Sequence, residues 1–333
     1  MVPLSVLDLS PIAEGSDAGQ ALRNSLDLAR HVEALGFRRF WMAEHHNLPG
    51  IASAATAVAL AHVASATKRI RIGAGGIMLP NHAPLIIAEQ FGTLAALHPG
   101  RVELGLGRAP GSDQLTFRAM RRNLLADVDQ FPQDVVELMH YFRSPEPGQR
   151  LQAVPGAGLE VPIWILGSSM FGAQLAAILG LPFAFASHFA PAMLKPAIQV
   201  YRERFRPSPQ LAVPHLMCGV TVVAAESADE ARFLFSSLQQ SSLNNRIGQP
   251  SRVPPPVADF AERLDPQARA ILGDALGAAI VGGPEAVKRG LDDFIERTGA
   301  DELIVTANIF DHDKRKRSFE IVAEIAGQAS SIR

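Results

Sequence analysis

Short runs of apolar and β-branched residues alternate with longer helical patterns along nearly the whole 333-residue chain. Two of these runs, Ile163–Leu166 and Leu303–Thr306, are continuously apolar instead of alternating between apolar and polar residues. Such runs are typical of parallel strands that are covered by helices. Because parallel neighbours need a crossover connection, the alternation favours an α/β fold made of right-handed βα units.

Eight segments are expected to form strands: Leu4–Leu9, Arg39–Ala43, Ile70–Ala74, Val102–Leu106, Pro162–Leu166, Phe183–Ser187, His215–Val223 and Leu303–Ala307. Helices are expected at Ala18–Leu35, Ser53–Ala66, Pro84–Leu97, Val128–Phe142, Ala173–Leu179, Met193–Phe205, Asp229–Gln239, Pro284–Arg297 and Lys314–Ala326. Eight βα units over this length favour a single (β/α)8 TIM barrel across residues 1–333, and an open doubly wound sheet is the alternative. Two longer connections, about 108–127 and 240–277, are expected to be insertion loops at the C-terminal face.

Charge and composition exclude several classes of partner. The 31 basic and 33 acidic residues give a net charge of −2, which provides no electrostatic basis for binding nucleic acid or an anionic membrane. The N-terminal residues lack a basic segment and read as a strand, so no secretory signal is expected. Residues 51–67 are too polar for a membrane span. We expect a cytoplasmic protein in which Cys218, the one cysteine, is a buried structural thiol.

In a parallel barrel, catalytic groups come from the C-terminal ends of strands and the loops that follow. Glu44, His45 and His46 end the second expected strand, and His188 follows the sixth. A histidine transfers protons near neutral pH, although a structural histidine at a loop is an equal alternative. Adjacent strand residues point to opposite sides, so only one of the two adjacent histidines is expected to face the barrel mouth.

A metal-dependent barrel hydrolase is one alternative function. The chain has no His-Glu-x-x-His sequence, and the Glu-His-His segment would need further ligands, for which His82 and His188 are the candidates. We therefore expect no metal site.

Two strand ends are suited to binding a phosphate. Arg108 follows a glycine-rich strand end, where it could grip an anion, or alternatively pair with Asp113. Gly167, Ser168 and Ser169 precede a helix, where amides and hydroxyls can bind a phosphate, or a serine can simply cap the helix.

A pair of glycines follows the third expected strand. Gly75 and Gly76 leave space where a flat ligand could lie against the backbone, and a tight turn is the alternative.

Four segments together resemble the bacterial luciferase-like monooxygenases. They are Trp41-Met-Ala-Glu-His-His-Asn47, Ile72-Gly-Ala-Gly-Gly-Ile-Met-Leu-Pro80, Ala88-Glu-Gln-Phe91 and His98-Pro-Gly-Arg-Val-Glu-Leu-Gly-Leu-Gly-Arg108. The resemblance spans nearly the whole chain, in order, and is nearest to family oxidoreductases without assigned light emission.

The resemblance implies a barrel that binds FMN or reduced FMN at its C-terminal mouth and uses O₂ to oxidise a small organic substrate. His45 matches the family's active-site histidine, with Glu44 and His188 as nearby polar groups. Gly75 and Gly76 match positions beside the flavin ring, where relatives hold a non-proline cis peptide. Arg108 and Gly167, Ser168 and Ser169 match phosphate-binding positions, although Met170-Phe171-Gly172 departs from the usual continuation of that loop.

The resemblance also bears on partners. Nothing in the chain resembles an NAD(P)H-binding domain, so a separate flavin reductase could supply reduced flavin. Relatives suggest a homodimer packed through barrel helices. The deazaflavin F420 is not excluded as the cofactor, and a non-catalytic flavin-binding barrel is a further alternative.

Overall fold

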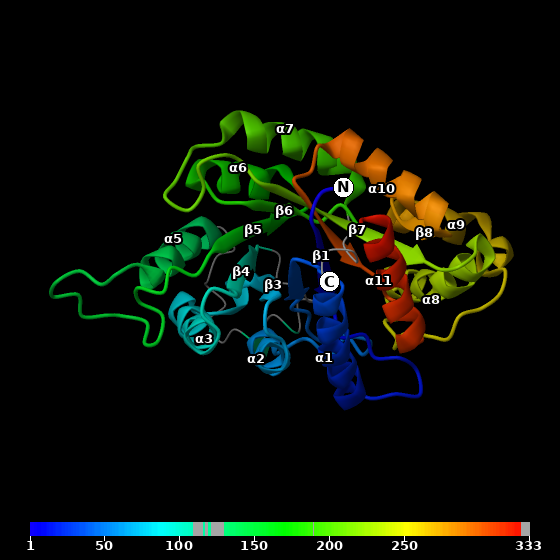
Figure 1. The fold of residues 1–333 in the computed structure, drawn as a ribbon, viewed down its shortest axis with the longest axis horizontal. Helices are drawn as coiled ribbons and strands as arrows, with labels where there is room; N and C mark the ends of the chain where they lie inside the picture. Colours follow the sequence, from blue (N-terminus) through cyan, green and yellow to red (C-terminus); the bar gives the residue numbers. More distant parts are fainter. Residues whose placement is uncertain (109–115, 117–118, 121–129, 189, 328–333) are drawn as a thin grey trace.

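The computed structural model describes residues 1–108, 116, 119–120, 130–188 and 190–327, and it contains a closed parallel barrel (Figure 1). Neighbouring strands pair in chain order, and the ring closes where the last strand pairs with both the first and the seventh. The barrel strands are β1 (Leu4–Asp8), β2 (Arg39–Met42), β3 (Arg71–Met78), β4 (Val102–Gly107), β5 (Ile163–Gly167), β6 (Phe183–Phe185), β7 (Leu216–Ala224) and β9 (Glu302–Thr306). The expected (β/α)8 fold is confirmed.

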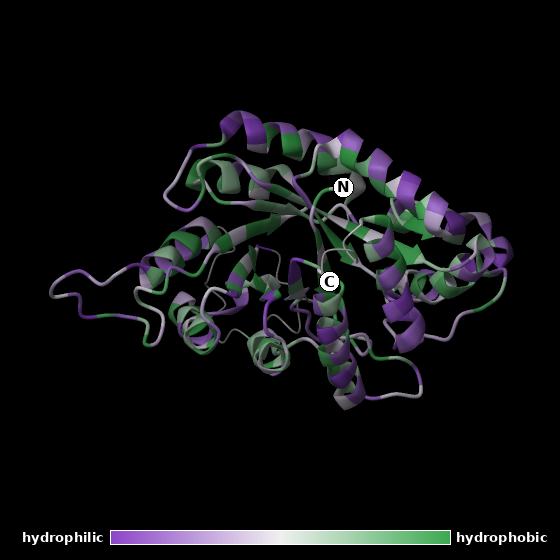
Figure 2. Cartoon of the chain, viewed as in Figure 1, coloured by the Kyte–Doolittle hydropathy of each residue, from purple (hydrophilic) through white to green (hydrophobic). Residues whose placement is uncertain are grey.

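Helices connect the strands and surround the barrel: α1 (Ala18–Ala34), α2 (Thr56–Ala66), α3 (Pro84–Leu97), α5 (Phe131–Phe142), α6 (Met170–Leu179), α7 (Leu194–Arg204), α8 (Ala228–Arg246), α10 (Pro284–Thr298) and α11 (His312–Ile325). Figure 2 shows hydrophobic residues along the strands and hydrophilic residues on the outer sides of α1, α7 and α10. Within the described ranges, no helix is both long and apolar enough to cross a membrane.

The strands are apolar on both sides because the barrel has two buried layers. Outward residues such as Leu4 and Val6 of β1 join the large cluster between strands and helices. The inward Leu7 joins a separate cluster with residues of five other strands, which can meet only inside the barrel. Trp41 and Trp164 pack edge to face there, with ring centroids 5.3 Å apart.

Charged residues fill the end of the barrel at which the strands begin. Arg39 is buried and lies 2.9 Å from carboxylate oxygens of both Glu103 and Glu302. Burial alone would raise the pKa of Glu302, but its hydrogen bond with His215 and the charge of Arg39 outweigh that effect and lower the pKa. An ion network therefore closes the barrel at the N-terminal ends of its strands, and the barrel opens at their C-terminal ends.

The region 240–277 differs from the expected loop. Helix α8 continues to Arg246 instead of ending at Gln239, and the segment also contains η4 (Phe260–Arg263) and α9 (Pro266–Leu276). The serines and asparagines of the last turns of α8 have modest helix propensity, but the helix is held by tertiary bonds such as that from Gln240 Nε2 to the Pro255 carbonyl. The other expected insertion, 108–127, lies mostly outside the described residues.

Two further features concern β7: a short strand that pairs with its end, and the cysteine within it. A short strand that was not expected, β8 (Ile280–Gly282), pairs with the end of β7, which extends beyond its pairing with β9. Cys218 is buried in β7, and burial raises the pKa of its thiol to about 12, as expected of a structural thiol.

Candidate functional site

A cavity of about 330 Å³ opens at the C-terminal ends of the barrel strands. Its lining includes every predicted site residue except Glu44, namely His45, Gly75, Gly76, Arg108, Gly167, Ser168, Ser169 and His188. The rest of its wall is mainly apolar, with contributions from Leu7, Trp41 and Leu166. The closed barrel thus brings together strand ends that lie more than 140 positions apart in the sequence, from His45 to His188.

The pair Gly75 and Gly76 lies within β3 and forms an irregularity in it, so the tight-turn alternative is wrong. The peptide bond between the two glycines is cis, as the family resemblance implied, and the pairing of β3 with β4 shifts register between Ala74 and Ile77. A Cβ atom on Gly75 would lie 2.8 Å from Leu7 Cδ1, and one on Gly76 would lie 2.7 Å from the Gly105 carbonyl oxygen. A side chain at Gly76 would therefore clash with the backbone of β4, whereas one at Gly75 would press on the end of Leu7 and on the Trp41 ring.

Glu44, the expected polar group beside His45, is buried and does not itself line the cavity. Its carboxylate is buried and accepts hydrogen bonds from Nε2 of His46 at 2.8 Å, Nε2 of His82 at 2.9 Å and the Met78 amide at 3.0 Å. Burial alone would raise the pKa of Glu44, but these bonds from His82, His46 and Met78 lower it. Its backbone amide also donates to the Gly76 carbonyl at 3.3 Å. Glu44 therefore positions the loops around the glycine pair.

The two adjacent histidines lie beyond the end of β2, in a loop where strand alternation does not apply, and their side chains separate. His45 lines the cavity, and His46 turns away to bind Glu44. Of these two histidines, His45 is the one placed to meet a molecule bound in the cavity.

His188 lines the same cavity from the segment after β6. Burial, and to a smaller extent the nearby His45, lower its pKa to about 4, although the Gly219 backbone opposes the shift. The imidazole of His188 is therefore neutral near neutral pH.

Gly219 is a site residue that the sequence interpretation missed. A Cβ atom on Gly219 would lie 2.7 Å from Cε1 of His188 and closer still to its Nδ1, so only glycine leaves room for the ring. The available signal was a glycine in the interior of the strand Leu216–Ala224, a pattern that indicates close approach of another group.

The anion-binding candidates meet at another part of the cavity. The guanidinium of Arg108 lies over the Phe171 ring, 4.2 Å from its centroid, and both residues line the cavity with Ser168 and Ser169. Ser169 is the N-cap residue of α6, but its side chain makes no capping bond within the described structure, which contradicts the simple-cap alternative for this serine. Asp113, the alternative partner of Arg108, lies outside the described residues.

The metal-site candidates do not assemble. His82 binds Glu44 outside the cavity, whereas His188 lines it. Within the described parts of the chain, no three His, Cys, Asp or Glu side chains form a group that could hold a metal ion.

Comparison of the folded chain with solved structures gives the same architecture. The apo structure of MsnO8 has a TM-score of 0.87 and 32% sequence identity, and the match covers 98% of this chain and 99% of that one. The oxygenating constituent of 3,6-diketocamphane monooxygenase from Pseudomonas putida, solved with FMN, has a TM-score of 0.72 at 19% identity, covering 100% and 99%. An F420-dependent secondary alcohol dehydrogenase has a TM-score of 0.66 at 15% identity, covering 98% and 99%. The last two share the fold.

Sequence comparison identifies the family. The chain is 51% identical to the Bacillus subtilis protein YvbT over 323 residues, which cover 97% of this chain and 96% of that protein. It is 49% identical to an Escherichia coli protein named luciferase-like monooxygenase, over 97% of each chain. The family model described as luciferase-like monooxygenase matches residues 2–302. The chain therefore belongs to the luciferase-like monooxygenase family.

Proposed function

We propose that this protein is a flavin-dependent monooxygenase that binds reduced FMN in the barrel cavity and uses O₂ to oxidise a small organic substrate. One observation carries the proposal: a single cavity combines a cationic end at Arg108 with an apolar bed beside Gly75 and Gly76. FMN has the same two parts, a phosphate and a flat ring.

The residues present fit FMN. Arg108 is held over Phe171, and the hydroxyls of Ser168 and Ser169 and the first amides of α6 stand nearby to receive a phosphate. Trp41 and Leu166 offer apolar surface for the ring. Bound reduced FMN would supply the electrons that activate O₂.

The protein's own groups would manage protons and water in this cavity. His45 is the candidate proton donor and acceptor because it faces the cavity. His188, held neutral by its low pKa, would offer a hydrogen bond without adding charge. Glu44 would act as a positioning residue through His46, His82 and Met78.

Replacing Arg108 with alanine tests the cofactor assignment. Because a hydrogen bond to a charged group contributes about 1.5–3 kcal/mol, Arg108→Ala should weaken FMN binding by roughly 10- to 100-fold. Riboflavin, which lacks the phosphate, should bind both proteins within a few-fold, and the exposed Arg232→Ala variant should bind FMN normally. Fluorescence titration measures the binding of FMN and riboflavin to the wild type and to Arg108→Ala, and the binding of FMN to Arg232→Ala. Equal weakening of FMN and riboflavin would move the phosphate away from Arg108.

Two alternative functions can be tested with the same purified protein. The F420-dependent dehydrogenase of the same fold makes F420 the competing cofactor, and tight binding of F420 without binding of FMN would replace our assignment. A non-catalytic flavin-binding barrel would bind FMN without altering the reaction of reduced FMN with oxygen.

The assembly proposal is a homodimer packed through barrel helices, with a separate reductase as the source of reduced flavin. Val58 on α2 and Ile86 and Leu97 on α3 are large apolar side chains that are 72%, 47% and 65% exposed. The helices α2 and α3 contact each other, and exposed apolar side chains on such a pair of helices are candidates for an association surface. Sedimentation velocity would report the mass in solution.

A further inference from the structure

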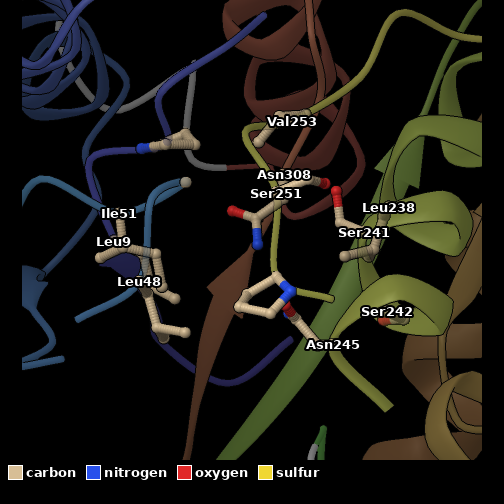
Figure 3. Close-up of a pocket in the computed structure, with 13 residues that line it drawn as sticks. Leu9, Leu48, Ile51, Leu238, Ser241, Ser242, Asn245, Ser251, Val253 and Asn308 are labelled. Carbon is tan, nitrogen blue, oxygen red and sulfur yellow. The ribbon is translucent and has the colours of Figure 1, made fainter. Parts of the chain in front are cut away.

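A second, smaller cavity of about 110 Å³ lies at the same end of the barrel. It is enclosed by the segments that follow β1 and β2 and by the second half of α8 (Figure 3). Leu9 contributes to the walls of both cavities, so the two are neighbours across this side chain. Nothing in the FMN assignment requires the smaller cavity.

The two sides of this cavity differ in chemistry. Leu9, Leu48 and Ile51 form one apolar side, and Ser241 and Asn245 of α8 face them across the space in Figure 3. Among the described residues that line it, none is ionisable. The cavity would therefore discriminate against a charged group, which would lose its hydration without gaining a counter-ion.

Asn308, one of the lining residues, carries an unsatisfied polar atom. Its carboxamide oxygen is buried and accepts no hydrogen bond within the described chain. Buried amide oxygens are nearly always paired in folded proteins. Since Asn308 lines the cavity, a rotation of its carboxamide would present this acceptor to a ligand that carries a hydroxyl or an amide N–H.

The walls are held in place by backbone hydrogen bonds between distant segments. The Val253 amide donates to the Ile12 carbonyl at 2.9 Å, and its carbonyl accepts from the Glu14 amide at 2.8 Å. The Ile12 amide donates to the Gly50 carbonyl at 2.9 Å. The cavity is therefore part of the folded barrel and does not depend on a ligand to form it.

We propose that this smaller cavity binds the uncharged end of the substrate, a short branched or linear aliphatic group that carries an alcohol or amide donor. The proposal rests on the proposed function, because the substrate's reacting part would extend past Leu9 toward the flavin cavity. A protein cavity of about 150 Å³ accepts benzene, so this one is expected to accept a group of about four to six non-hydrogen atoms.

A pair of probes of nearly equal shape tests the proposal. Isobutyramide is neutral and carries an N–H donor, whereas isobutyrate has the same carbon skeleton, a negative charge and no donor. Saturation-transfer NMR on the full-length protein should detect isobutyramide, with isobutyrate weaker by about tenfold or more because of its desolvation cost. Equal signals from the two probes would overturn the proposal.

Three variants locate the binding. Ser241→Phe fills the cavity and should abolish the isobutyramide signal, whereas Gln239→Phe on the same helix places the same ring outside the lining and should leave it unchanged. Asn308→Ala should weaken the signal by about fivefold, the size expected for one neutral hydrogen bond. An unchanged signal in both Ser241→Phe and Asn308→Ala would overturn the assignment to this cavity.

Titration of the same proteins with FMN separates this inference from the proposed function. Ser241→Phe and Asn308→Ala should bind FMN like the wild type, because neither residue contacts the larger cavity. If the wild type binds isobutyramide selectively and does not bind FMN, the cavity assignment stands and the flavin assignment fails. If the wild type binds FMN but binds isobutyramide and isobutyrate equally, the flavin assignment stands and the cavity assignment fails.

Discussion

Replacing Gly219 with alanine should displace His188 and slow the reaction of bound reduced FMN with oxygen. The added Cβ would lie 2.7 Å from Cε1 of His188, whereas ordinary contact begins at 3.4 Å. Because Nδ1 of the ring would lie closer still, the ring must withdraw by more than about 0.7 Å, or β7 must move by a similar amount. Overpacking of this kind costs about 1–3 kcal/mol of stability.

The effect on rate should be larger than the effect on binding. A misplacement of about 1 Å at a reacting centre can cost roughly 10²-fold in rate, so a shift of more than about 0.7 Å should slow the oxygen reaction by about 10-fold or more. FMN affinity should remain within about threefold, because Arg108, the proposed phosphate-binding residue, is untouched. Stopped-flow absorbance of reduced FMN mixed with oxygen measures this rate without knowledge of the substrate.

Two controls decide whether the effect acts through His188. Gly273→Ala adds a Cβ with no heavy atom within 4 Å and should leave the rate unchanged. In a His188→Ala background, Gly219→Ala should add little further loss, because the group that it displaces is gone. If Gly219→Ala slows the reaction as much without His188 as with it, the reasoning is refuted.

Two further predictions concern stability. The pKa of His188 in the folded protein is about 4, below the ordinary value of 6.5, so the unfolded chain binds more protons between these two pH values. The contribution of His188 to the free energy of unfolding is therefore complete above about pH 6.5. It falls by up to about 3 kcal/mol as the pH drops toward 4. Urea unfolding should show a smaller loss between about pH 7.5 and about pH 5 in His188→Gln, and an identical loss would contradict the shift. Arg39→Met should cost about 3–5 kcal/mol because it leaves Glu103 and Glu302 buried with one fewer cation. Arg232→Met, which breaks an exposed pair with Asp229, should cost at most about 1 kcal/mol in the same denaturation assay, and similar losses would argue against the ion network.

The sequence by itself determined the fold class and most of the polar side chains that line the cavity. Continuously apolar strands alternating with helices predict a parallel sheet with covered faces, and eight units close it into a ring. Once the ring is closed, the residue that follows each strand must lie at one mouth. This rule placed His45, Arg108, Ser168 and His188 together, since it depends only on strand order and not on side-chain packing.

Tertiary structure decided which side chains at those strand ends face the cavity and which support it. Glu44 and His45 are adjacent in sequence, yet Glu44 is buried by His46, His82 and Met78, because a carboxylate gains most from three donors that only the fold assembles. Likewise, the sequence could not place Gly219 against His188 or Asn308 beside α8, since these contacts join segments that lie 31 or more positions apart. Strand periodicity is a local property of the chain, whereas pairing of polar groups and room for a ring depend on residues that meet only after the barrel has closed.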